Sequence, residues 1–335
     1  MIYYLGIKKG NGLVRLLDSL KVGDITLKNR IVMPPMYTGF ATKKGEVTKK
    51  LVDHYIDRCK NLGLLIIEHS YVAIDGKLSE RQLGAYNESL ISGLKKLSRR
   101  IQSMGTPVIL QISHAGNRAM SEVAGIKKFS SSSNNQSHEL ESDEIKVIIQ
   151  RFAKAAEWGI KAGFNGIEIH GAHGFLLNQF YSPITNKRSD QYGGCLENRL
   201  RFPLEVVREV KKKIRNKLLL YRLGSDDLDP RGTKIWESQI FAIKLENAGV
   251  NLIDVSGGIC GSRPNILQGI QGYFVSQAQQ IRKAVNVPVI GVGGIKEAEF
   301  ANRLIEEEKV DLIAVGRQLF KDSDWATKTV ERLKI

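Results

Sequence analysis

Two histidines at the end of an apolar segment are the residues of this chain best suited to chemistry. The apolar run 164–169 ends at His170, and His173 follows three residues later. Where a buried strand ends at an open mouth, two imidazoles at this spacing form a pair of hydrogen-bond donors for one substrate oxygen. Such donors stabilise negative charge that develops on the oxygen during reaction. Ordinary polar packing at a strand end is the competing interpretation.

Short apolar runs alternate with amphipathic stretches along the chain. We expect eight strands, at 30–33, 64–68, 108–112, 166–169, 218–222, 252–255, 287–292 and 312–315. We expect helices between and after them, at 49–62, 88–104, 142–162, 197–215, 234–248, 275–284, 298–307 and 323–333. Strands that alternate with helices indicate parallel βαβ units. Eight such units predict an α/β fold of one domain, the (β/α)8 or TIM barrel.

The active site of such a barrel lies at the carboxyl ends of its strands. Each expected strand is followed by residues of chemical interest: Met36 and Tyr37, Glu68 and His69, Gln111 and His114, His170 and His173, Arg222, Ser256 and Gly257, Gly293 and Gly294, and Gly316 and Arg317. An open doubly wound sheet would instead need a Gly-x-Gly-x-x-Gly turn after its first strand, and none follows 30–33. The sequence therefore predicts one barrel mouth that collects these groups.

Glycines and an arginine follow the last two expected strands. Gly293 and Gly294 follow the seventh strand, and Gly316 and Arg317 follow the eighth. Loops at these positions of barrels often bind phosphate through backbone N–H groups. An arginine there adds a forked, charge-assisted donor. We therefore expect a phosphate site, with ordinary tight turns as the alternative.

A phosphate site at one side of the mouth implies a ring elsewhere in it. The amide of Gln111 both donates and accepts, which suits the edge of a pyrimidine-like ring. Arg222, at the end of the fifth expected strand, offers a fixed positive charge for that edge. A salt bridge from Arg222 to Asp226 or Asp227 is the alternative.

The composition excludes several classes of protein. The 335 residues are 42% hydrophobic, enough for a sizeable core, but no apolar run reaches the length of a membrane span. The net charge of +15 is spread along the expected helices and does not alternate with aromatics, so we expect no nucleic-acid partner. Three distant cysteines without a Cys-x-x-Cys predict neither a metal site nor disulfides. The N-terminus lacks a signal-peptide pattern, so we expect a cytoplasmic protein with small-molecule partners.

Two segments fall outside the regular alternation. Residues 1–16 form an N-terminal extension without an assigned role, and the barrel occupies 17–335. The polar loop at about 115–142 follows the third expected strand and has a low-complexity centre at 129–136. A long loop at the active-site face is usually a lid or disordered. We expect a flap over the site.

Several strings, taken in order, resemble the old yellow enzyme family, the NADH:flavin oxidoreductases. The most specific is 167–199, which contains Ile-Glu-Ile-His-Gly-Ala-His-Gly-Phe and later Asn-Lys-Arg-Ser-Asp-Gln-Tyr-Gly-Gly. Corroborating strings are Leu-Lys-Asn-Arg-Ile-Val-Met-Pro-Pro-Met at 27–36, Gln-Ile-Ser-His-Ala-Gly at 111–116, Arg222, and 311–317. The match runs from about residue 17 to the C-terminus. It implies a barrel that binds FMN.

The resemblance also implies a role for each matching residue. The residues that would line the flavin are Pro34, Pro35, Met36 and Tyr37. His69 would contact the flavin through its backbone. The ring would be bound by Gln111 and Arg222, and the phosphate by Gly293, Gly294, Gly316 and Arg317. His170 and His173 would hold the oxygen of the acceptor above the ring.

The implied activity has two halves that use one binding place. NAD(P)H gives hydride to the flavin and leaves. An α,β-unsaturated carbonyl or nitro compound then takes the hydride at its β-carbon and a proton at its α-carbon. Larger members of the family add a cysteine cluster and a second nucleotide domain. This chain lacks those cysteines, so we expect a short form that takes hydride directly from NADH or NADPH, either as a monomer or as a homo-oligomer.

Three positions depart from the family. Phe175 stands where most members carry a proton-donating tyrosine, so Tyr181 or water would supply the proton. Tyr37 stands where relatives place a small thiol or hydroxyl residue that tunes the flavin. Tyr37 is either a catalytic residue whose phenol hydrogen-bonds the flavin, or a residue that narrows the pocket. Gly39 replaces a substrate-binding tyrosine of one branch, a loss that Tyr37 could partly offset. We expect weaker enone reduction than in a typical member.

Two other functions remain compatible with the sequence. Loss of the tyrosine fits an NADH oxidase or flavin-binding protein without ene-reductase activity. A flavin-dependent reductase of tRNA would fit the basic charge, but such an enzyme needs a cysteine over the flavin. Cys59 falls in an expected helix and Cys195 in a glycine-rich turn, so neither is well placed.

Overall fold

The eight expected strands close into a parallel barrel. The computed structural model describes residues 15–120 and 128–334. Neighbouring strands of the closed sheet follow the order β3, β4, β5, β8, β9, β10, β11, β12, and every pair is parallel. Their bounds are β3 (Ile31–Met33), β4 (Leu64–Tyr71), β5 (Val108–Ser113), β8 (Gly166–Gly171), β9 (Leu218–Gly224), β10 (Leu252–Ser256), β11 (Val289–Gly291) and β12 (Leu312–Ala314). The predicted barrel class is confirmed.

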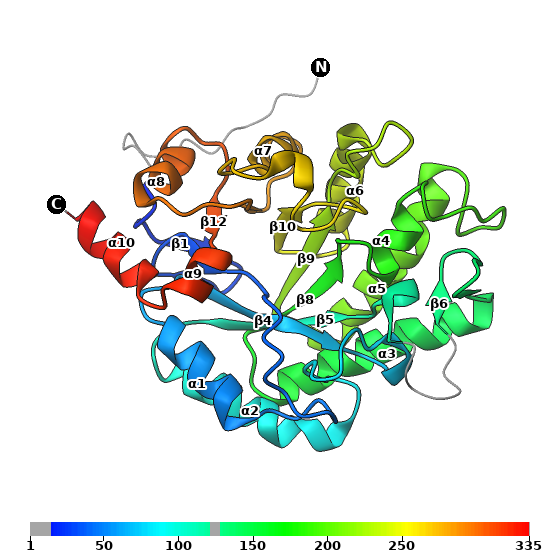
Figure 1. Cartoon of the computed structure of the whole chain (residues 1–335), viewed down its shortest axis with the longest axis horizontal. Helices are drawn as coiled ribbons and strands as arrows, with labels where there is room; N and C mark the ends of the chain where they lie inside the picture. The colour runs from blue at the N-terminus through cyan, green and yellow to red at the C-terminus, as the bar shows by residue number, and fades with distance from the viewer. Residues whose placement is uncertain (1–14, 121–127, 335) are drawn as a thin grey trace.

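Helices surround this barrel on the outside (Figure 1). Those in the predicted stretches are α1 (Lys49–Arg58), α2 (Ile91–Gln102), α3 (Ser142–Lys161), α5 (Leu196–Ile214), α6 (Ile235–Asn247), α7 (Val275–Arg282), α8 (Ala298–Glu306) and α10 (Trp325–Leu333). The short helix η2 (Glu88–Leu90) forms the start of the expected stretch 88–104. Short helices that were not predicted are α4 (Leu176–Tyr181), α9 (Arg317–Lys321), η1 (Ile74–Gly76), η3 (Gly116–Arg118) and η4 (Asn265–Leu267). Within the described residues, none of the helices has the length and apolar character that a membrane crossing requires.

The interior of the barrel is apolar at the end opposite the mouth. Alternate residues of a strand point to the same face, and one buried cluster collects inward residues such as Val32, Leu64 and Ile109. An antiparallel hairpin of β1 (Leu20–Val22) and β2 (Ile25–Leu27) precedes β3. Its Val22 and Leu27 belong to the same cluster. The hairpin therefore closes the bottom of the barrel.

A layer of buried polar side chains lies above this apolar filling. The polar residues stand two positions after inward apolar ones: Glu68 after Ile66, Gln111 after Ile109, Arg222 after Leu220, and Asp254 after Leu252. On β8, Glu168 pairs in register with Gln111, and His170 pairs with Arg222. The pleat of the strands thus gathers polar groups from neighbouring strands at the mouth.

The described part of the predicted flap is folded against the loop after α4. It contains two short strands, β6 (Phe129–Ser130) and β7 (His138–Glu139). The guanidinium of Arg188 donates to the carbonyls of Ser131 and Leu140, at 3.1 and 2.8 Å. Residues 121–127 of the predicted flap and residues 1–14 of the predicted extension, which was expected at 1–16, lie outside the described residues.

Candidate active site

Strand β8 and the turn after it position the two histidines. His170 is buried at an inward position of β8. His173 is partly exposed and has a φ of 58°, a left-handed conformation that is uncommon for a residue with a side chain. Its backbone N–H donates to the carbonyl of Gly257 at 3.1 Å, which folds the turn back over the mouth. The two imidazole centroids consequently lie 5.1 Å apart.

Each imidazole has one ring nitrogen engaged by the protein. The amide nitrogen of Gln111 lies 3.4 Å from His170 Nδ1, and the hydroxyl of Ser256 lies 2.7 Å from His173 Nε2. An amide N–H only donates, so His170 accepts at Nδ1 and carries its proton on Nε2. In the described part of the chain, His170 Nε2 and His173 Nδ1 have no hydrogen-bond partner. These two nitrogens are available to a single oxygen atom.

Both imidazoles are neutral around pH 7. Burial lowers the pKa of His170 well below its usual range, and the neighbouring His173 and Arg222 lower it further. Burial also lowers the pKa of His173, with Arg222 and Arg118 contributing. A neutral imidazole donates its N–H without exchanging a proton near pH 7. The pair is therefore suited to hydrogen-bonding an oxygen that becomes negative.

Phe175 lies among the histidines, where its ring closes one side of the site. The ring centroid is 4.3 Å from that of His170 and 5.3 Å from that of His69, with edge-on geometry. We call His69, His170, His173 and Phe175 the histidine wall. Tyr37 stacks on its outer side, 5.8 Å from the His69 ring, and is 40% exposed. Phe175, which departs from the pattern expected at this position, is therefore in direct ring contact with both His69 and His170.

Gln82 fixes the side chain of His69. The Gln82 amide oxygen accepts from the N–H of Leu78 at 2.7 Å, which identifies its other end as the amide nitrogen. That nitrogen lies 2.7 Å from His69 Nδ1 and 3.0 Å from the His69 carbonyl. Burial lowers the pKa of His69 to about 4, helped by the charges of Arg222 and Arg118. His69 is accordingly a neutral ring whose backbone carbonyl already accepts one hydrogen bond.

Tyr181 does not lie at the mouth, so the suggestion that it replaces the missing tyrosine is wrong. It ends α4 and is fully buried, with its hydroxyl 2.8 Å from Ser238 Oγ and its ring against Phe241 of α6. Burial raises the pKa of this phenol well above its usual range. The helical turn of α4 carries Tyr181 away from the histidines, although it is only a few residues further along the chain.

Four side chains of the polar layer form the floor of the mouth. The Gln111 amide nitrogen donates to Glu168 at 2.7 Å, and Arg222 Nε lies 3.4 Å from a carboxyl oxygen of Asp254. The alternative partners proposed for Arg222, Asp226 and Asp227, are therefore incorrect. Burial raises the pKa of Glu168 and of Asp254; the charge of Asp254 raises that of Glu168 further, while Arg222 lowers both.

Several polar atoms of this floor lack a hydrogen-bond partner. Among the described residues they include Arg222 Nε, Glu168 Oε2 and both carboxyl oxygens of Asp254. Arg222 and Asp254 are close enough for an ion pair, but their orientation does not make a hydrogen bond. Buried polar groups are normally satisfied. The floor is thus built to receive a ligand with both donors and acceptors on its edge.

The turns after β11 and β12 are closely packed around their glycines, most tightly at Gly293. Gly293 has a φ of 132°, and a Cβ on it would lie 2.6 Å from the backbone nitrogen of Tyr273. A Cβ on Gly294 would lie 3.4 Å from the guanidinium of Arg317, and one on Gly316 would lie 2.9 Å from the sulfur of Met36. We call Gly293, Gly294 and Gly316 the glycine turns. Close backbone approach of this kind suits a phosphate group.

The end of β3 and Arg317 complete this side of the mouth. Pro34 and Pro35 are buried directly after β3, and a Cβ on Gly316 would lie 3.2 Å from the Pro34 ring. Arg317 donates to the hydroxyl of Tyr273 at 3.0 Å. The structure therefore brings together the residues predicted for a phosphate and those predicted to line a ring.

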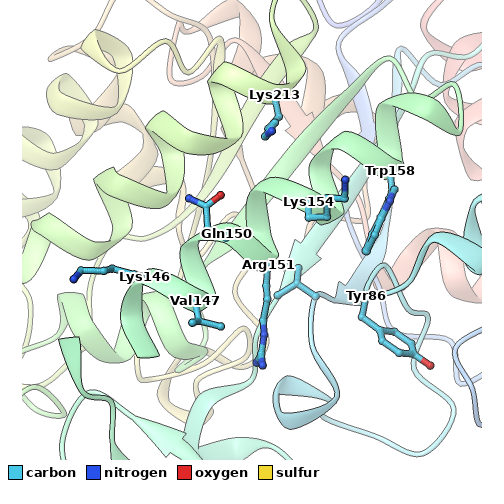
Figure 2. A pocket seen from close by; sticks show the side chains of 9 residues that line it. Tyr86, Lys146, Val147, Gln150, Arg151, Lys154, Trp158 and Lys213 are labelled. Carbon is cyan, nitrogen blue, oxygen red and sulfur yellow. The ribbon is translucent and has the colours of Figure 1, made fainter. Parts of the chain in front are cut away.

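A cavity elsewhere on the molecule contains none of the predicted site residues. It measures about 500 Å³ and opens beside α3 on the outer wall, lined by Tyr86, Val147, Arg151, Trp158 and neighbours (Figure 2). It lies on the helical shell, whereas the chemistry described above lies at the barrel mouth. In the described residues, no group of three or more histidine, cysteine or acidic side chains is arranged to hold a metal ion.

Glu168 and Asp254 are site residues that the sequence analysis missed. Each interrupts an otherwise apolar strand, in Gly-Ile-Glu-Ile-His and Leu-Ile-Asp-Val-Ser. A carboxyl group within an apolar strand is rarely buried without a partner. This pattern could have identified both residues, because the pleat places them on the same face of their strands as His170 and Ser256.

Comparisons with known proteins agree with this geometry. Residues 15–334 match the profile of the NADH:flavin oxidoreductase / NADH oxidase family. The chain belongs to this family. It is 39% identical over 324 residues to an NADH oxidase of Thermoanaerobacter brockii, covering 93% of this chain and 50% of that protein. It is 34% identical over 325 residues to an NADPH dehydrogenase of Bacillus subtilis, covering 95% of both. The chain thus spans half the length of the first relative and nearly all of the second.

Solved structures show the same barrel. A 2-naphthoyl-CoA reductase in complex with 2-naphthoyl-CoA superposes with a TM-score of 0.88 and 26% identity, over 95% of this chain and 52% of that one. Morphinone reductase superposes with a TM-score of 0.86 and 23% identity, over 97% and 91% of the two chains, and so supports the fold alone. Membership in this family makes FMN the cofactor.

The residues at the mouth fit FMN on structural grounds. The orphaned donors and acceptors of the floor suit the polar edge of a flavin ring, and the glycine turns suit its phosphate. In the ring of strands, β12 lies four positions from β8, on the opposite side of the barrel. A ligand with a ring at one end and a phosphate at the other can therefore span the mouth.

Proposed function

We propose that this chain is an FMN-dependent oxidoreductase that takes hydride from NAD(P)H and passes it to an alkene activated by a carbonyl or nitro group. The observation that carries the proposal is a pair of imidazole nitrogens at the barrel mouth, His170 Nε2 and His173 Nδ1, that have no partner among the described residues. The family relationship supports the nicotinamide half of the proposal, since relatives are an NADH oxidase and an NADPH dehydrogenase.

Each part of the mouth has a proposed role toward FMN. Gln111 and Arg222 would bind the polar edge of the ring, and the positive charge of Arg222 favours negative charge on that edge. The residues proposed to line the ring are Pro34, Pro35, Met36, Tyr37 and the backbone of His69. Those proposed to hold the phosphate are Gly293, Gly294, Gly316 and Arg317. Bound FMN would supply the hydride transfer between nicotinamide and acceptor.

The histidines act on the acceptor. His170 and His173 would hydrogen-bond its carbonyl or nitro oxygen and stabilise the negative charge that develops as hydride reaches the β-carbon. Because both rings are neutral, they donate N–H groups and keep their protons. Phe175 has no hydroxyl and Tyr181 is buried against α6, so we infer that water delivers the proton to the α-carbon. Tyr37, half-exposed beside His69, would narrow the entrance.

An anaerobic experiment tests this function. The FMN-loaded protein is reduced with one equivalent of NADH or NADPH, 2-cyclohexenone is added, and reoxidation is followed at the visible flavin band. We expect reoxidation, slower than in enzymes that carry a tyrosine at position 175. Reduction by the nicotinamide with no reoxidation by any enone or nitroalkene would refute the alkene half of the proposal.

A second candidate function is reduction of oxygen without an alkene substrate. Phe175 supports it, because a site without a proton-donating phenol has lost one element of ene-reduction. The relative from Thermoanaerobacter brockii is itself named an NADH oxidase. Steady NADH consumption that requires oxygen, and that 2-cyclohexenone does not accelerate, would favour this candidate.

Cysteine placement argues against a reductase of tRNA. Cys59 is buried at the end of α1, and Cys195 is exposed immediately before α5. The contacts of the histidine wall described above involve neither residue. Cys260 follows β10, and its thiol donates to the carbonyl of Asp226 at 3.3 Å. A gel-shift assay with tRNA should show no specific complex.

A further inference from the structure

We propose that Arg118 makes this site selective for acceptors that carry a negatively charged group, such as a carboxylate, a few bonds from the activating carbonyl. The inference rests on the function proposed above and names its substrate class. Arg118 ends the short turn η3 after β5 and is exposed. It was not among the predicted site residues.

The guanidinium of Arg118 lies on the histidine wall. Its Nη1 donates to the carbonyl oxygen of His173. The guanidinium carbon is 5.9 Å from the centroid of the Phe175 ring, in position for a cation–π contact. The arginine therefore borders the place where an acceptor bound to His170 and His173 would lie.

The turn that carries Arg118 is held by one buried amide. The Gln179 nitrogen donates to the Ala115 carbonyl at 3.2 Å, to Asn117 Oδ1 at 2.8 Å and to the Gly174 carbonyl at 2.7 Å. The Gln179 oxygen accepts from the Asn117 N–H at 3.3 Å. These bonds join the turn after β5 to the turn after β8. The backbone that carries Arg118 is therefore fixed before a ligand binds, which reduces the conformational entropy lost on binding.

The charge of Arg118 has no carboxylate partner within the described residues. Other arginines around the barrel do: Arg151 lies 2.6 Å from Asp75, and Arg188 lies 2.6 Å from Asp190. The positive charge of Arg118 acts on the site itself, since it contributes to the low pKa of His69, His170 and His173. Of its forked donors, only Nη1 is engaged by residues that the structure describes. The remaining donors match the geometry of a carboxylate.

A matched pair of ligands tests the subsite by binding. The saturated acid 4-oxo-4-phenylbutanoate and its methyl ester are titrated calorimetrically into the oxidised, FMN-loaded enzyme. We expect the acid to bind about ten-fold more tightly than the ester, as for one charge-assisted contact. This preference should shrink in 0.5 M NaCl, where the Debye length is about 4 Å. Equal affinities in low salt would overturn the proposal.

Variants then assign the preference to one residue. Arg118→Gln should remove most of the acid preference while leaving ester affinity within about two-fold, and Arg118→Lys should restore part of it. Arg100→Gln removes the same charge from an exposed position on α2 and should change neither affinity. Equal losses for acid and ester in Arg118→Gln would mean that the arginine only supports the turn, and would overturn the proposal.

Kinetics separate this inference from the proposed function. The unsaturated acid 4-oxo-4-phenylbut-2-enoate and its methyl ester serve as acceptors, and Arg118→Gln should raise the KM of the acid alone. A selective rise in the KM of NADPH over that of NADH, with acceptor preference unchanged, would assign Arg118 to the reductant and overturn the proposal. If the wild-type enzyme reduces neither acceptor yet still binds the saturated acid preferentially, the function fails while the anion subsite stands.

Discussion

The histidine wall and the glycine turns lie on opposite sides of the barrel mouth and differ in which atoms are offered to a ligand. On the histidine wall, side chains provide the polar contacts, and each ring is fixed by a neighbour such as Gln111, Ser256 or Gln82. At the glycine turns, the backbone approaches so closely that a single added Cβ would collide with Tyr273 or Met36.

This difference predicts different consequences for substitution. A side-chain change on the histidine wall removes one functional group and leaves the backbone in place, so it should alter acceptor reduction and spare FMN binding. A methyl group added to a glycine turn displaces the backbone itself, so it should weaken FMN binding first. Variants from the two regions can therefore be told apart by FMN affinity alone.

The largest expected effect is on the histidine wall. His170→Asn keeps a buried polar side chain but loses the Nε2–H at its present position. We expect the rate of flavin reoxidation by 2-cyclohexenone to fall about 10² to 10³-fold, as for loss of one oxyanion donor. Rapid mixing of the NADH-reduced variant with enone measures it. FMN affinity should stay within about three-fold; a parallel loss of FMN would erase the distinction between the two regions.

The next effect belongs to the glycine turns. Gly293→Ala places a methyl group 2.6 Å from the Tyr273 nitrogen at a φ of 132°, which costs about 2 kcal/mol or 30-fold in FMN affinity. Fluorescence titration of the FMN-free protein gives the dissociation constant. Gly105→Ala is the matched control, because Gly105 has a φ of 74° but open space around its Cβ position. Equal losses of FMN affinity in Gly293→Ala and Gly105→Ala would mean that backbone strain in general, rather than the position of this turn at the mouth, weakens FMN binding.

Phe175→Tyr should act in the opposite direction. The added hydroxyl extends from a ring packed 4.3 Å from His170 and restores a general acid at the site. We expect reoxidation by 2-cyclohexenone to rise about ten-fold, with reduction by NADH unchanged. Stopped-flow measurement of both half-reactions tests this. No gain would show that water already delivers the proton fast enough.

Asp254→Asn tests the floor between the two regions. Removing the carboxyl beside Arg222 leaves the arginine charge less compensated, which should favour negative charge on the flavin edge. We expect the midpoint potential to rise by about 30 mV, equivalent to about 1.4 kcal/mol for two electrons. Spectroelectrochemical titration measures it. Glu237→Gln, which breaks a buried pair with Arg199 outside the mouth, should leave the potential unchanged.

The smallest expected effect concerns pH. The pKa values of His170 and His173 lie well below 6.5, so both rings stay neutral from pH 6 to 8 and reoxidation by enone should vary less than two-fold. Glu68 is the group that burial brings into this window, since its pKa is raised to about 7. If a titration near pH 7 does appear, Glu68→Gln should abolish it. A titration that survives this change would belong to another buried group of the mouth, either a carboxyl of the floor, Glu168 or Asp254, or one of the histidines.

Much of the barrel could be predicted from sequence because each strand and helix carries its own periodicity. Candidate site residues could be named where strand ends carry distinctive chemistry, as with His170, His173 and Arg317, and their roles stay a prediction. The prediction failed where three-dimensional packing decides. Tyr181 is close to the histidines in sequence, yet α4 carries it to Ser238. The partner of Arg222 is Asp254, thirty-two residues away, rather than the adjacent Asp226.

The hairpin β1–β2 has a consequence for the order of events during turnover. Because Val22 and Leu27 pack into the bottom of the barrel, the described residues leave the end with the histidines as the open one. If a nicotinamide and an acceptor both bind there, as proposed, one must leave before the other can bind. Excess NADH should then inhibit reoxidation of the flavin by the acceptor, and excess acceptor should inhibit reduction of the flavin by NADH. We expect parallel double-reciprocal plots that curve upward at high NADH or high enone, because the hairpin leaves one end of the barrel open.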